Sequence, residues 1–329
     1  MASAGTIAQV EALLRARRFA DAAGRLIAAA ASGEPDSAAT LAHWRIGGTF
    51  VRRDLAEARR LLGLAGAGGN VDAALLHASF LAAGVGGADD WPAALAELRE
   101  LAPRDPRAAA ALRLVEAMDL GPDGFPARPA ETRILSRAPH AAVAERFLTE
   151  AECAYLREAG EPALEPSVVA DPATGRMVPH PVRSSDAAMF GVHAEDVAVN
   201  ALNRRIAALS RTRPDQGEPL QLLRYRPGGE YKPHMDALPA EANQRILTVL
   251  VYLSDDYEGG ETRFPRTGLT FRGRTGDALL FRNAAADGRP DPLALHAGLP
   301  VTKGTKFLAS RWIRARAFTY PPPRPLLDL

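Results

Sequence analysis

The stretch that decides the fold reads Leu220-Gln-Leu-Leu-Arg-Tyr-Arg-Pro-Gly-Gly-Glu-Tyr-Lys-Pro-His234-Met-Asp236. It ends with a histidine and an aspartate two positions apart, and residues two apart on a strand point to the same side. A distant second histidine, His296, completes a set of two histidines and one carboxylate. Such a set is typical of ferrous iron sites that leave positions open for other ligands. Each histidine alone could be a structural residue, so the prediction depends on the set.

Short β-rich runs separated by Gly, Pro and Asp follow this stretch. The strongest are residues 246–253, 278–281 and 306–314. Several strands in succession predict a sandwich or a barrel. Two helices are predicted before them: one begins at the capping box Thr149-Glu-Ala-Glu152, and one is an amphipathic segment at residues 196–209. We expect an α+β domain here.

The N-terminal third of the chain is rich in alanine and leucine, and it repeats. Residues 19–26 align with residues 55–62 and again with residues 91–98, in steps of 36. Alanine-rich segments lie between these units. A period in the mid-thirties with two helices per unit indicates a solenoid of helical hairpins. Such arrays present a surface for a partner, so we expect a protein partner here; the alternative is that the repeats only pack against the rest of the chain.

The segment Gly121-Pro-Asp-Gly-Phe-Pro-Ala-Arg-Pro129 interrupts this pattern, because its prolines and glycines cannot continue a helix. We therefore predict a multidomain chain, α then α+β. The expected ranges are a helical repeat domain at 1–120, a linker at 121–130 and a second domain at 131–329. Residues 166–181 are polar and rich in turn-forming residues, and we expect them to form a loop over the binding groove.

Composition restricts the possible partners and location. The 329 residues carry a net charge of +1, which gives no reason to expect nucleic acid or a membrane surface as a partner. Cys153 is the only cysteine, so no intrachain disulfide can form, as is usual in a reducing compartment. The first residues lack a basic patch followed by an apolar run, so we expect no signal peptide. Together these features favour a cytoplasmic location.

The motifs from residue 220 to residue 314 resemble, in order and spacing, those of the prolyl 4-hydroxylase branch of the Fe(II)- and 2-oxoglutarate-dependent oxygenases. The resemblance implies a double-stranded β-helix, or jelly roll, with helices bracing one sheet. It implies Fe(2+), 2-oxoglutarate as co-substrate and L-ascorbate as a reductant. The implied reaction is hydroxylation of an unactivated C–H bond, prolyl 4-hydroxylation of a protein or peptide, with release of succinate and CO2. The repeats loosely resemble Sel1 and tetratricopeptide repeats.

The same resemblance implies a role for particular residues. The metal and catalytic set is His234, Asp236 and His296. The co-substrate set is Lys306, Tyr225 and Thr248, where the lysine pairs with the far carboxylate of 2-oxoglutarate. The substrate set is Arg183, in the element Arg183-Ser184-Ser185, with Tyr231 and Trp312.

Alternatives remain at several of these positions. Lys303 is the alternative to Lys306 as the lysine that binds the carboxylate of 2-oxoglutarate. Thr248 could equally be an ordinary strand residue, and Trp312 could be part of the core. For the whole chain the alternatives are a hydroxylase of a free amino acid or small metabolite, and an inactive oxygenase fold that binds partners through the repeats. The sequence names neither the substrate, nor the partner of the repeats, nor the oligomeric state.

Overall fold

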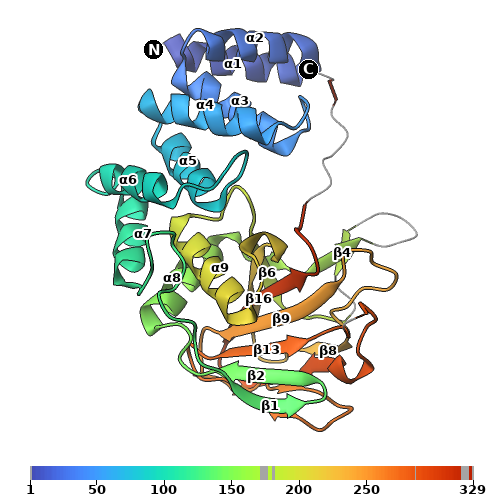
Figure 1. The fold of residues 1–329 in the computed structure, drawn as a ribbon. Helices are drawn as coiled ribbons and strands as arrows, with labels where there is room; N and C mark the ends of the chain where they lie inside the picture. Colours follow the sequence, from blue (N-terminus) through green and yellow to red (C-terminus); the bar gives the residue numbers. More distant parts are fainter. Residues whose placement is uncertain (1, 171–176, 180–181, 286, 320–325, 328–329) are drawn as a thin grey trace. The chain divides into compact units, whose positions relative to one another are not determined.

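The computed structural model describes residues 2–170, 177–179, 182–285, 287–319 and 326–327 (Figure 1). The chain divides into two compact units. The first comprises residues 1–125, 195–201 and 319–329, and the second comprises residues 126–194 and 202–318. The boundary at residue 125 falls inside the expected linker. The expected ranges are continuous in sequence, whereas these units are not, and the domain ranges stay a prediction.

The N-terminal segment of the first unit, residues 2–125, contains seven helices: α1 (Ala2–Arg15), α2 (Phe19–Ala31), α3 (Pro35–Gly47), α4 (Leu55–Ala67), α5 (Val71–Ala83), α6 (Trp91–Leu101) and α7 (Pro106–Ala117). The first helices of three successive hairpins begin at Phe19, Leu55 and Trp91, so the predicted step of 36 residues recurs in the structure. Buried alanines line the helix contacts, including Ala22, Ala58 and Ala94, each fully buried. The helical repeat is confirmed.

Local capping explains where these helices begin. Helices α4 to α7 each follow an acidic or amide side chain that accepts a hydrogen bond from the first turn: Asp54, Asn70, Asp90 and Asp105. Polar bonds also join successive hairpins. Asn70 donates to Asp36 at 2.9 Å, and Arg107 donates to Asp72 at 2.7 Å. In both cases the bond joins the start of a hairpin's second helix to the start of the second helix in the preceding hairpin.

The second unit is built on an eight-stranded sheet in the order β1-β2-β13-β9-β16-β7-β6-β3, with every neighbouring pair antiparallel. Its strands are β1 (Arg133–Arg137), β2 (His140–Ala144), β3 (Glu165–Pro166), β6 (Asp186–Phe190), β7 (Leu220–Tyr225), β9 (Arg245–Tyr252), β13 (Ala278–Arg282) and β16 (Lys306–Arg314). The three strongest predicted strands correspond to β9, β13 and β16.

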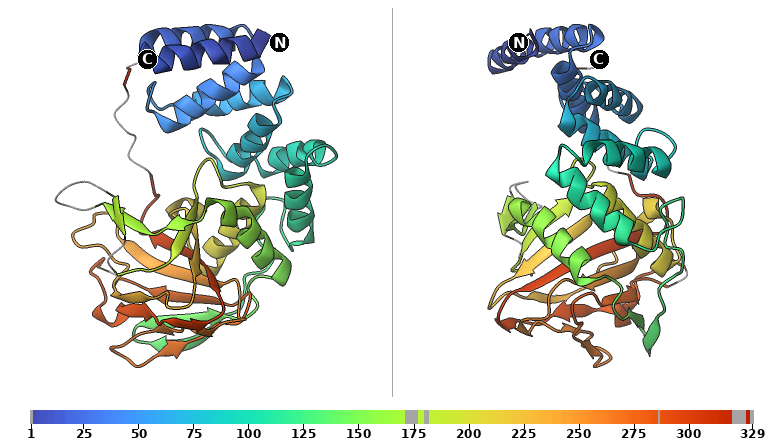
Figure 2. Two further views of the ribbon diagram at one scale, coloured as in Figure 1. Left: turned by 180° about the vertical axis from the view of Figure 1, so that it is seen from behind. Right: turned by 90° about the vertical axis from the view of Figure 1, so that its left-hand side faces the viewer.

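A second, four-stranded sheet has the order β12-β11-β14-β8. Its strands are β8 (Tyr231–His234), β11 (Thr262–Arg263), β12 (Thr270–Phe271) and β14 (His296–Gly298), and β10 (Glu258–Gly259) pairs separately with β15 (Val301–Lys303). An apolar cluster that includes Leu250 and Leu308 of the large sheet forms the core, and Tyr231 and Phe271 of the smaller sheet pack against it. Two antiparallel sheets around one core are the jelly roll that the resemblance implies (Figure 2).

Helix α8 (Glu150–Gly160) belongs to the second unit, and so does helix α9 (Val197–Ser210) from Leu202 onward. The predicted capping box of α8 is present at Thr149 and Glu152. Gly160 lets α8 approach the sheet closely, because a Cβ there would lie 2.7 Å from Leu222 of β7. From β16, Arg311 donates to the backbone oxygen of Asn203 in α9 at 3.1 Å. These helices therefore brace the face of the sheet to which Arg311 points.

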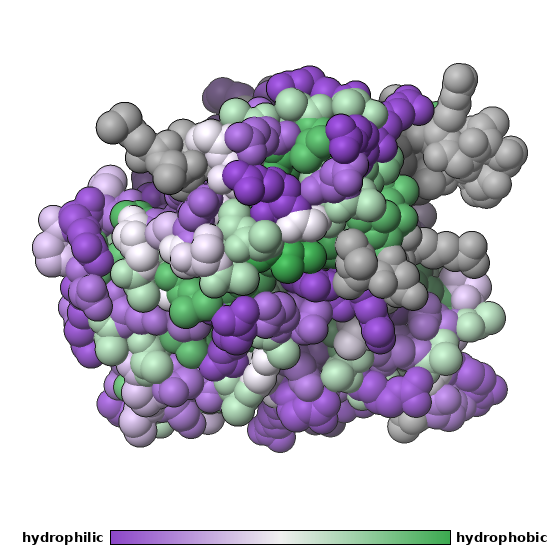
Figure 3. Space-filling view, turned by 90° about the horizontal axis from the view of Figure 1, so that it is seen from above, coloured by the Kyte–Doolittle hydropathy of each residue, from purple (hydrophilic) through white to green (hydrophobic). Residues whose placement is uncertain are grey.

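The predicted loop at residues 166–181 includes two short strands, β4 (Val168–Ala170) and β5 (Met177–Pro179), which pair with each other. Residues 171–176 and 180–181 of that loop lie outside the described part of the chain. The face drawn in Figure 3 mixes hydrophilic and hydrophobic side chains. Within the described residues, no helix is both long enough and apolar enough to span a bilayer.

Candidate active site

The two histidines of the motif lie on neighbouring strands of the four-stranded sheet. His234 ends β8, His296 begins β14, and the two residues are direct partners in the strand register. Their ring centroids are 4.2 Å apart. Asp236 follows β8, and one ligand atom from each of the three residues lies within 4.8 Å of the others. The fold thus brings the predicted metal set together.

Backbone carbonyls orient both imidazoles. Nδ1 of His234 lies 2.9 Å from the oxygen of Lys232, and Nδ1 of His296 lies 3.0 Å from the oxygen of Ala294. Because a carbonyl can only accept, Nδ1 donates in each ring, and in the neutral form of each ring Nε2 keeps a free lone pair. The two Nε2 atoms lie 3.5 Å and 3.7 Å from the carboxylate of Asp236. This is the arrangement of metal-ligating histidines.

Burial and charge set the protonation of this group. Burial lowers the pKa of His296 to about 4, so its imidazole is neutral near pH 7. Burial alone would raise the pKa of Asp236, but His296, His234 and a hydrogen bond from Thr248 outweigh it and hold that pKa well below its usual value. Two imidazole nitrogens and one ionised carboxylate are donors that suit Fe(II). The residues present therefore fit this metal.

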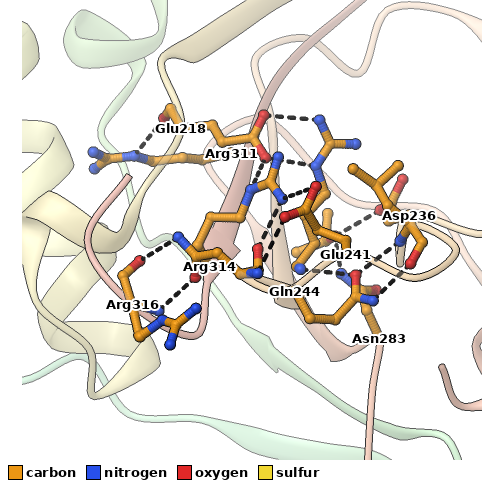
Figure 4. Close-up of polar contacts among 12 residues, drawn as sticks. Glu218, Asp236, Glu241, Gln244, Asn283, Arg311, Arg314 and Arg316 are labelled. Atoms are coloured by element: carbon orange, nitrogen blue, oxygen red, sulfur yellow. Dashed lines mark hydrogen bonds and ion pairs between the residues drawn. The ribbon is translucent and has the colours of Figure 1, made fainter. Parts of the chain in front are cut away.

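Two further polar residues support the carboxylate. Thr248 of β9 donates from its hydroxyl to Oδ2 of Asp236 at 2.6 Å, and Asn283 donates to the same hydroxyl at 2.8 Å. Figure 4 shows Asp236 and Asn283 within this set of contacts. We predicted that Thr248 donates to the co-substrate. In the structure, the single hydroxyl proton of Thr248 is donated to Asp236 instead. A contact between Thr248 and 2-oxoglutarate stays a prediction. Asn283 lies in no motif, and the sequence analysis missed it.

Lys306 is a buried cation at the start of β16. It is only 3% exposed, and its Nζ donates to the backbone oxygen of Gly260 at 2.7 Å. Among the residues that the structure describes, no carboxylate lies within ion-pair distance of this ammonium. Burial lowers the pKa of Lys306 to about 8, although Glu261 acts in the opposite direction. A buried ammonium without a counter-charge is costly, so the site is suited to an anionic ligand.

The two candidate lysines differ in their surroundings. Lys303 is exposed and forms an ion pair with Glu258 at 3.1 Å. Lys306 lies directly opposite Tyr225 of β7 in the strand register, with Nζ 5.5 Å from the centre of the tyrosine ring. Tyr225 is itself buried. Only Lys306 of the two lines the pocket that contains the metal set.

One pocket is lined by almost all of the predicted site residues. It is lined by every candidate residue except Thr248, namely Arg183, Tyr225, Tyr231, His234, Asp236, His296, Lys306 and Trp312. The sequence analysis missed its other lining residues, which are Leu223, Leu250, Thr262, Gly298, Leu308 and Ser310. The signal for some of them was strand alternation, since residues 306, 308, 310 and 312 of β16 all face the pocket.

The three predicted substrate residues lie on the wall of this pocket. The ring of Tyr231 stacks on His234 with centroids 3.4 Å apart, and the guanidinium of Arg183 lies 5.5 Å from the centre of the Tyr231 ring. Trp312 is half-buried, and the guanidinium of Arg245 lies 3.7 Å from its ring centre. A cation over an aromatic face is attractive and limits its movement. Their contact with substrate stays a prediction.

A buried ion-pair network holds Arg245 in that position. Glu218 accepts two hydrogen bonds from Arg245, at 2.6 Å and 2.8 Å, and one from Arg314 at 2.5 Å. Figure 4 shows Glu218 and Arg314 together with Gln244. The amide of Gln244 accepts from the backbone nitrogen of Leu238 and donates to its oxygen. These bonds fix the backbone that follows Asp236.

Comparison with known proteins identifies a family model and several relatives that this chain resembles. Residues 220–314 match the family model of the 2OG-Fe(II) oxygenase superfamily. Prolyl 4-hydroxylase 1 of Arabidopsis thaliana is 37% identical over 204 residues, which cover 56% of this chain and 72% of that protein. Prolyl 4-hydroxylase 5 of the same plant is 35% identical over 209 residues, with 56% and 72% covered.

Solved structures of prolyl hydroxylases also match. The viral collagen prolyl hydroxylase of Paramecium Bursaria Chlorella virus-1, in complex with 2OG, is 28% identical with a TM-score of 0.44, and the match covers 54% of this chain and 96% of that chain. A Pseudomonas putida prolyl-4-hydroxylase is 18% identical with a TM-score of 0.39, and 54% and 93% are covered.

A His-Asp-His set beside a buried lysine, together with the matching family model, places this chain in the class of 2-oxoglutarate- and Fe(II)-dependent dioxygenases. The sequence relatives narrow the class. This chain belongs to the prolyl 4-hydroxylase family, as the identity to plant prolyl 4-hydroxylases and the share of their length that it covers show. The chain is therefore an enzyme that uses Fe(2+) and 2-oxoglutarate.

Proposed function

We propose that this enzyme hydroxylates a prolyl residue of a protein or peptide and converts 2-oxoglutarate to succinate and CO2. The observation that carries the proposal is the shared pocket, in which the metal set, Lys306 and an aromatic wall lie together. The family relatives support the choice of proline. The choice of the 4-position of the ring rests on that relationship alone.

Each protein group has a defined task in this reaction. His234, Asp236 and His296 would hold iron(II), and the ammonium of Lys306 would bind the distal carboxylate of 2-oxoglutarate with help from the Tyr225 hydroxyl. Iron(II), when bound, supplies the oxidative chemistry that couples decarboxylation of 2-oxoglutarate by dioxygen to hydroxylation of a C–H bond. The protein's contribution is to place the reacting groups and exclude competing reactions.

The pocket wall would position the substrate. Tyr231 and Trp312 offer flat apolar faces to a proline ring, and Arg183 offers hydrogen-bond donors for peptide carbonyls. Nε of Arg183 is buried without a hydrogen-bond partner within the described chain. A buried donor without a partner is costly, so a substrate acceptor at this position would satisfy it. This supports a peptide with backbone carbonyls over a free amino acid, which remains the second candidate.

The helical repeats would recruit a protein. Their 36-residue step and hairpin construction support a Sel1-like or tetratricopeptide-like array, which commonly presents a surface to a partner. L-Ascorbate is proposed as the reductant that rescues turnovers uncoupled from substrate. The cytoplasmic location is likewise a proposal that rests on the single, free and buried Cys153. An adaptor without activity is disfavoured, because the complete metal set and Lys306 are retained.

A direct test measures succinate release with Fe(II), 2-oxoglutarate, ascorbate and a pool of peptides from a cell lysate, followed by mass spectrometry of the peptides. The proposal expects peptide-dependent succinate and an added oxygen on proline. Succinate that depends on a free amino acid, but not on any peptide, would instead support the second candidate.

A further inference from the structure

A buried chain of hydrogen bonds extends from the metal-binding carboxylate to a residue outside every motif. Asn283 donates from Nδ2 to the hydroxyl of Thr248 at 2.8 Å, and Thr248 donates to Oδ2 of Asp236 at 2.6 Å. Asn283 is 1% exposed, Thr248 is fully buried and Asp236 is 4% exposed. Water therefore cannot readily replace either bond.

The direction of this chain follows from its chemistry. An ionised carboxylate only accepts hydrogen bonds, so the single hydroxyl proton of Thr248 is the one donated to Asp236. The threonine oxygen can then only accept from its other neighbour, which requires the amide nitrogen of Asn283 on that side. The amide thus determines which way the hydroxyl points.

The other half of the same amide has no partner. Oδ1 of Asn283 is buried and accepts no hydrogen bond from the residues that the structure describes. A buried polar atom without a partner calls for an explanation. A leucine of similar volume would avoid this unpaired oxygen, so the useful part of the side chain is its donor.

Two backbone hydrogen bonds hold Asn283 in place and thereby position its side-chain amide. Its nitrogen donates to the oxygen of Ile246 in β9 at 2.9 Å, and its oxygen accepts from the nitrogen of Asp291 at 2.9 Å. Asp291 caps the short helix Pro292–Ala294, whose last residue holds Nδ1 of His296. Asn283 therefore lies between the strand that carries Thr248 and the segment that leads to His296.

We propose that Asn283 is a positioning residue of the metal site: its amide orients the Thr248 hydroxyl, which in turn holds the Asp236 carboxylate toward the two histidines. The inference rests on the metal site of the proposed function, but not on proline as its substrate. Without the amide, the hydroxyl is free to turn, and the carboxylate loses a fixed partner. Loss of such an outer partner typically lowers metal affinity about 10- to 100-fold.

The test is a calorimetric titration of the full-length apo chain with Mn²⁺ alone, without 2-oxoglutarate or peptide, beside the melting temperature of each apo variant. Thr248→Val removes the hydroxyl at nearly constant shape, and Thr248→Ser restores it. Asn283→Leu removes the amide, and Asn283→Ala serves if the leucine variant does not fold. The control is Asn203→Leu, because Asn203 is 1% exposed and its side-chain amide has no hydrogen-bond partner among the described residues, but it lies outside the site.

We expect Thr248→Val to weaken Mn²⁺ binding about 10- to 100-fold, and Asn283→Leu to weaken it by no more than that. The double variant should bind as Thr248→Val does, because Asn283 acts through the hydroxyl and coupled residues are not additive. Thr248→Ser and Asn203→Leu should bind as the wild type does.

Two results would overturn the inference. One is an additive loss in the double variant, which would mean that Asn283 acts independently of Thr248. The other is a lower melting temperature in Asn283→Leu and Asn283→Ala with unchanged Mn²⁺ affinity, which would mean that the residue is only structural. Failure of the proposed function looks different, because wild-type Mn²⁺ binding and the variant pattern would persist while no prolyl product formed.

Discussion

Replacement of Lys306 by methionine should weaken 2-oxoglutarate binding strongly while leaving the fold and the metal site in place. The side chain of Lys306 is buried near two tyrosine rings, with Nζ 5.5 Å from the centre of Tyr225 and 5.3 Å from that of Tyr252. Methionine keeps most of that packing and removes only the ammonium. The change therefore isolates the charge.

The magnitude follows from the surroundings of the ammonium. In the free protein it donates to the backbone oxygen of Gly260 and is 3% exposed, so its desolvation is already complete before the ligand arrives. A buried charge-assisted bond to a carboxylate contributes about 1.5–3 kcal/mol. At about 1.4 kcal/mol per factor of ten, the dissociation constant of 2-oxoglutarate should rise by about one to two orders of magnitude.

The assay is calorimetric binding of 2-oxoglutarate to the Mn²⁺-loaded protein, with Lys303→Met as the matched control. Lys303 is exposed and paired with Glu258, so its loss should change the affinity by less than a factor of two to three. Unchanged binding in Lys306→Met, or a larger effect in Lys303→Met, would refute the assignment of the buried lysine.

Three further predictions concern pH, the metal ligands and the repeats. Burial lowers the pKa of Lys306 to about 8, so the ammonium form is present below that pH and is lost as the pH rises through it; 2-oxoglutarate affinity should fall on the alkaline side, and an affinity that stays constant there would count against the prediction. His234→Ala or Asp236→Ala should abolish turnover while circular dichroism shows the fold retained, and hydroxylation near the wild-type rate in either variant would exclude the metal assignment. Deletion of residues 1–125 should leave 2-oxoglutarate decarboxylation, measured as succinate release, and reduce turnover of a native protein substrate; an insoluble product would mean that the helices complete the second unit, and unchanged kinetics on the native substrate would mean that the repeats do not recruit it.

The sequence predicts the parts of the structure that depend on local pattern. The step of 36 residues locates three helical hairpins, and the β-rich runs at residues 306–314 and 246–253 locate two central strands. The His234-Met-Asp236 motif places two ligands on one side of a strand end. The distal histidine and lysine were found by spacing within a known family, and the fold then brings them into one pocket.

The parts that were missed depend on contacts between segments far apart in the chain. Asn283 reaches Thr248 across two neighbouring strands, and nothing in its own surroundings in the sequence marks it. Thr248 shows the same limit, because nothing in its own surroundings in the sequence marks its hydrogen bond to Asp236. Residues 195–201 group with the first unit, although they lie well past the linker. Local pattern cannot report such pairings.

We propose that the reaction at this pocket is the hydroxylation of proline in a peptide. The most direct measurement is tandem mass spectrometry of lysate peptides after incubation with the wild-type enzyme, Fe(II), 2-oxoglutarate and ascorbate, with Asp236→Ala incubated in parallel. We expect an oxygen added to prolyl residues, at least one succinate for each, and neither product with Asp236→Ala. Wild-type succinate accompanied by oxygen on some other residue, and on no proline, would contradict it.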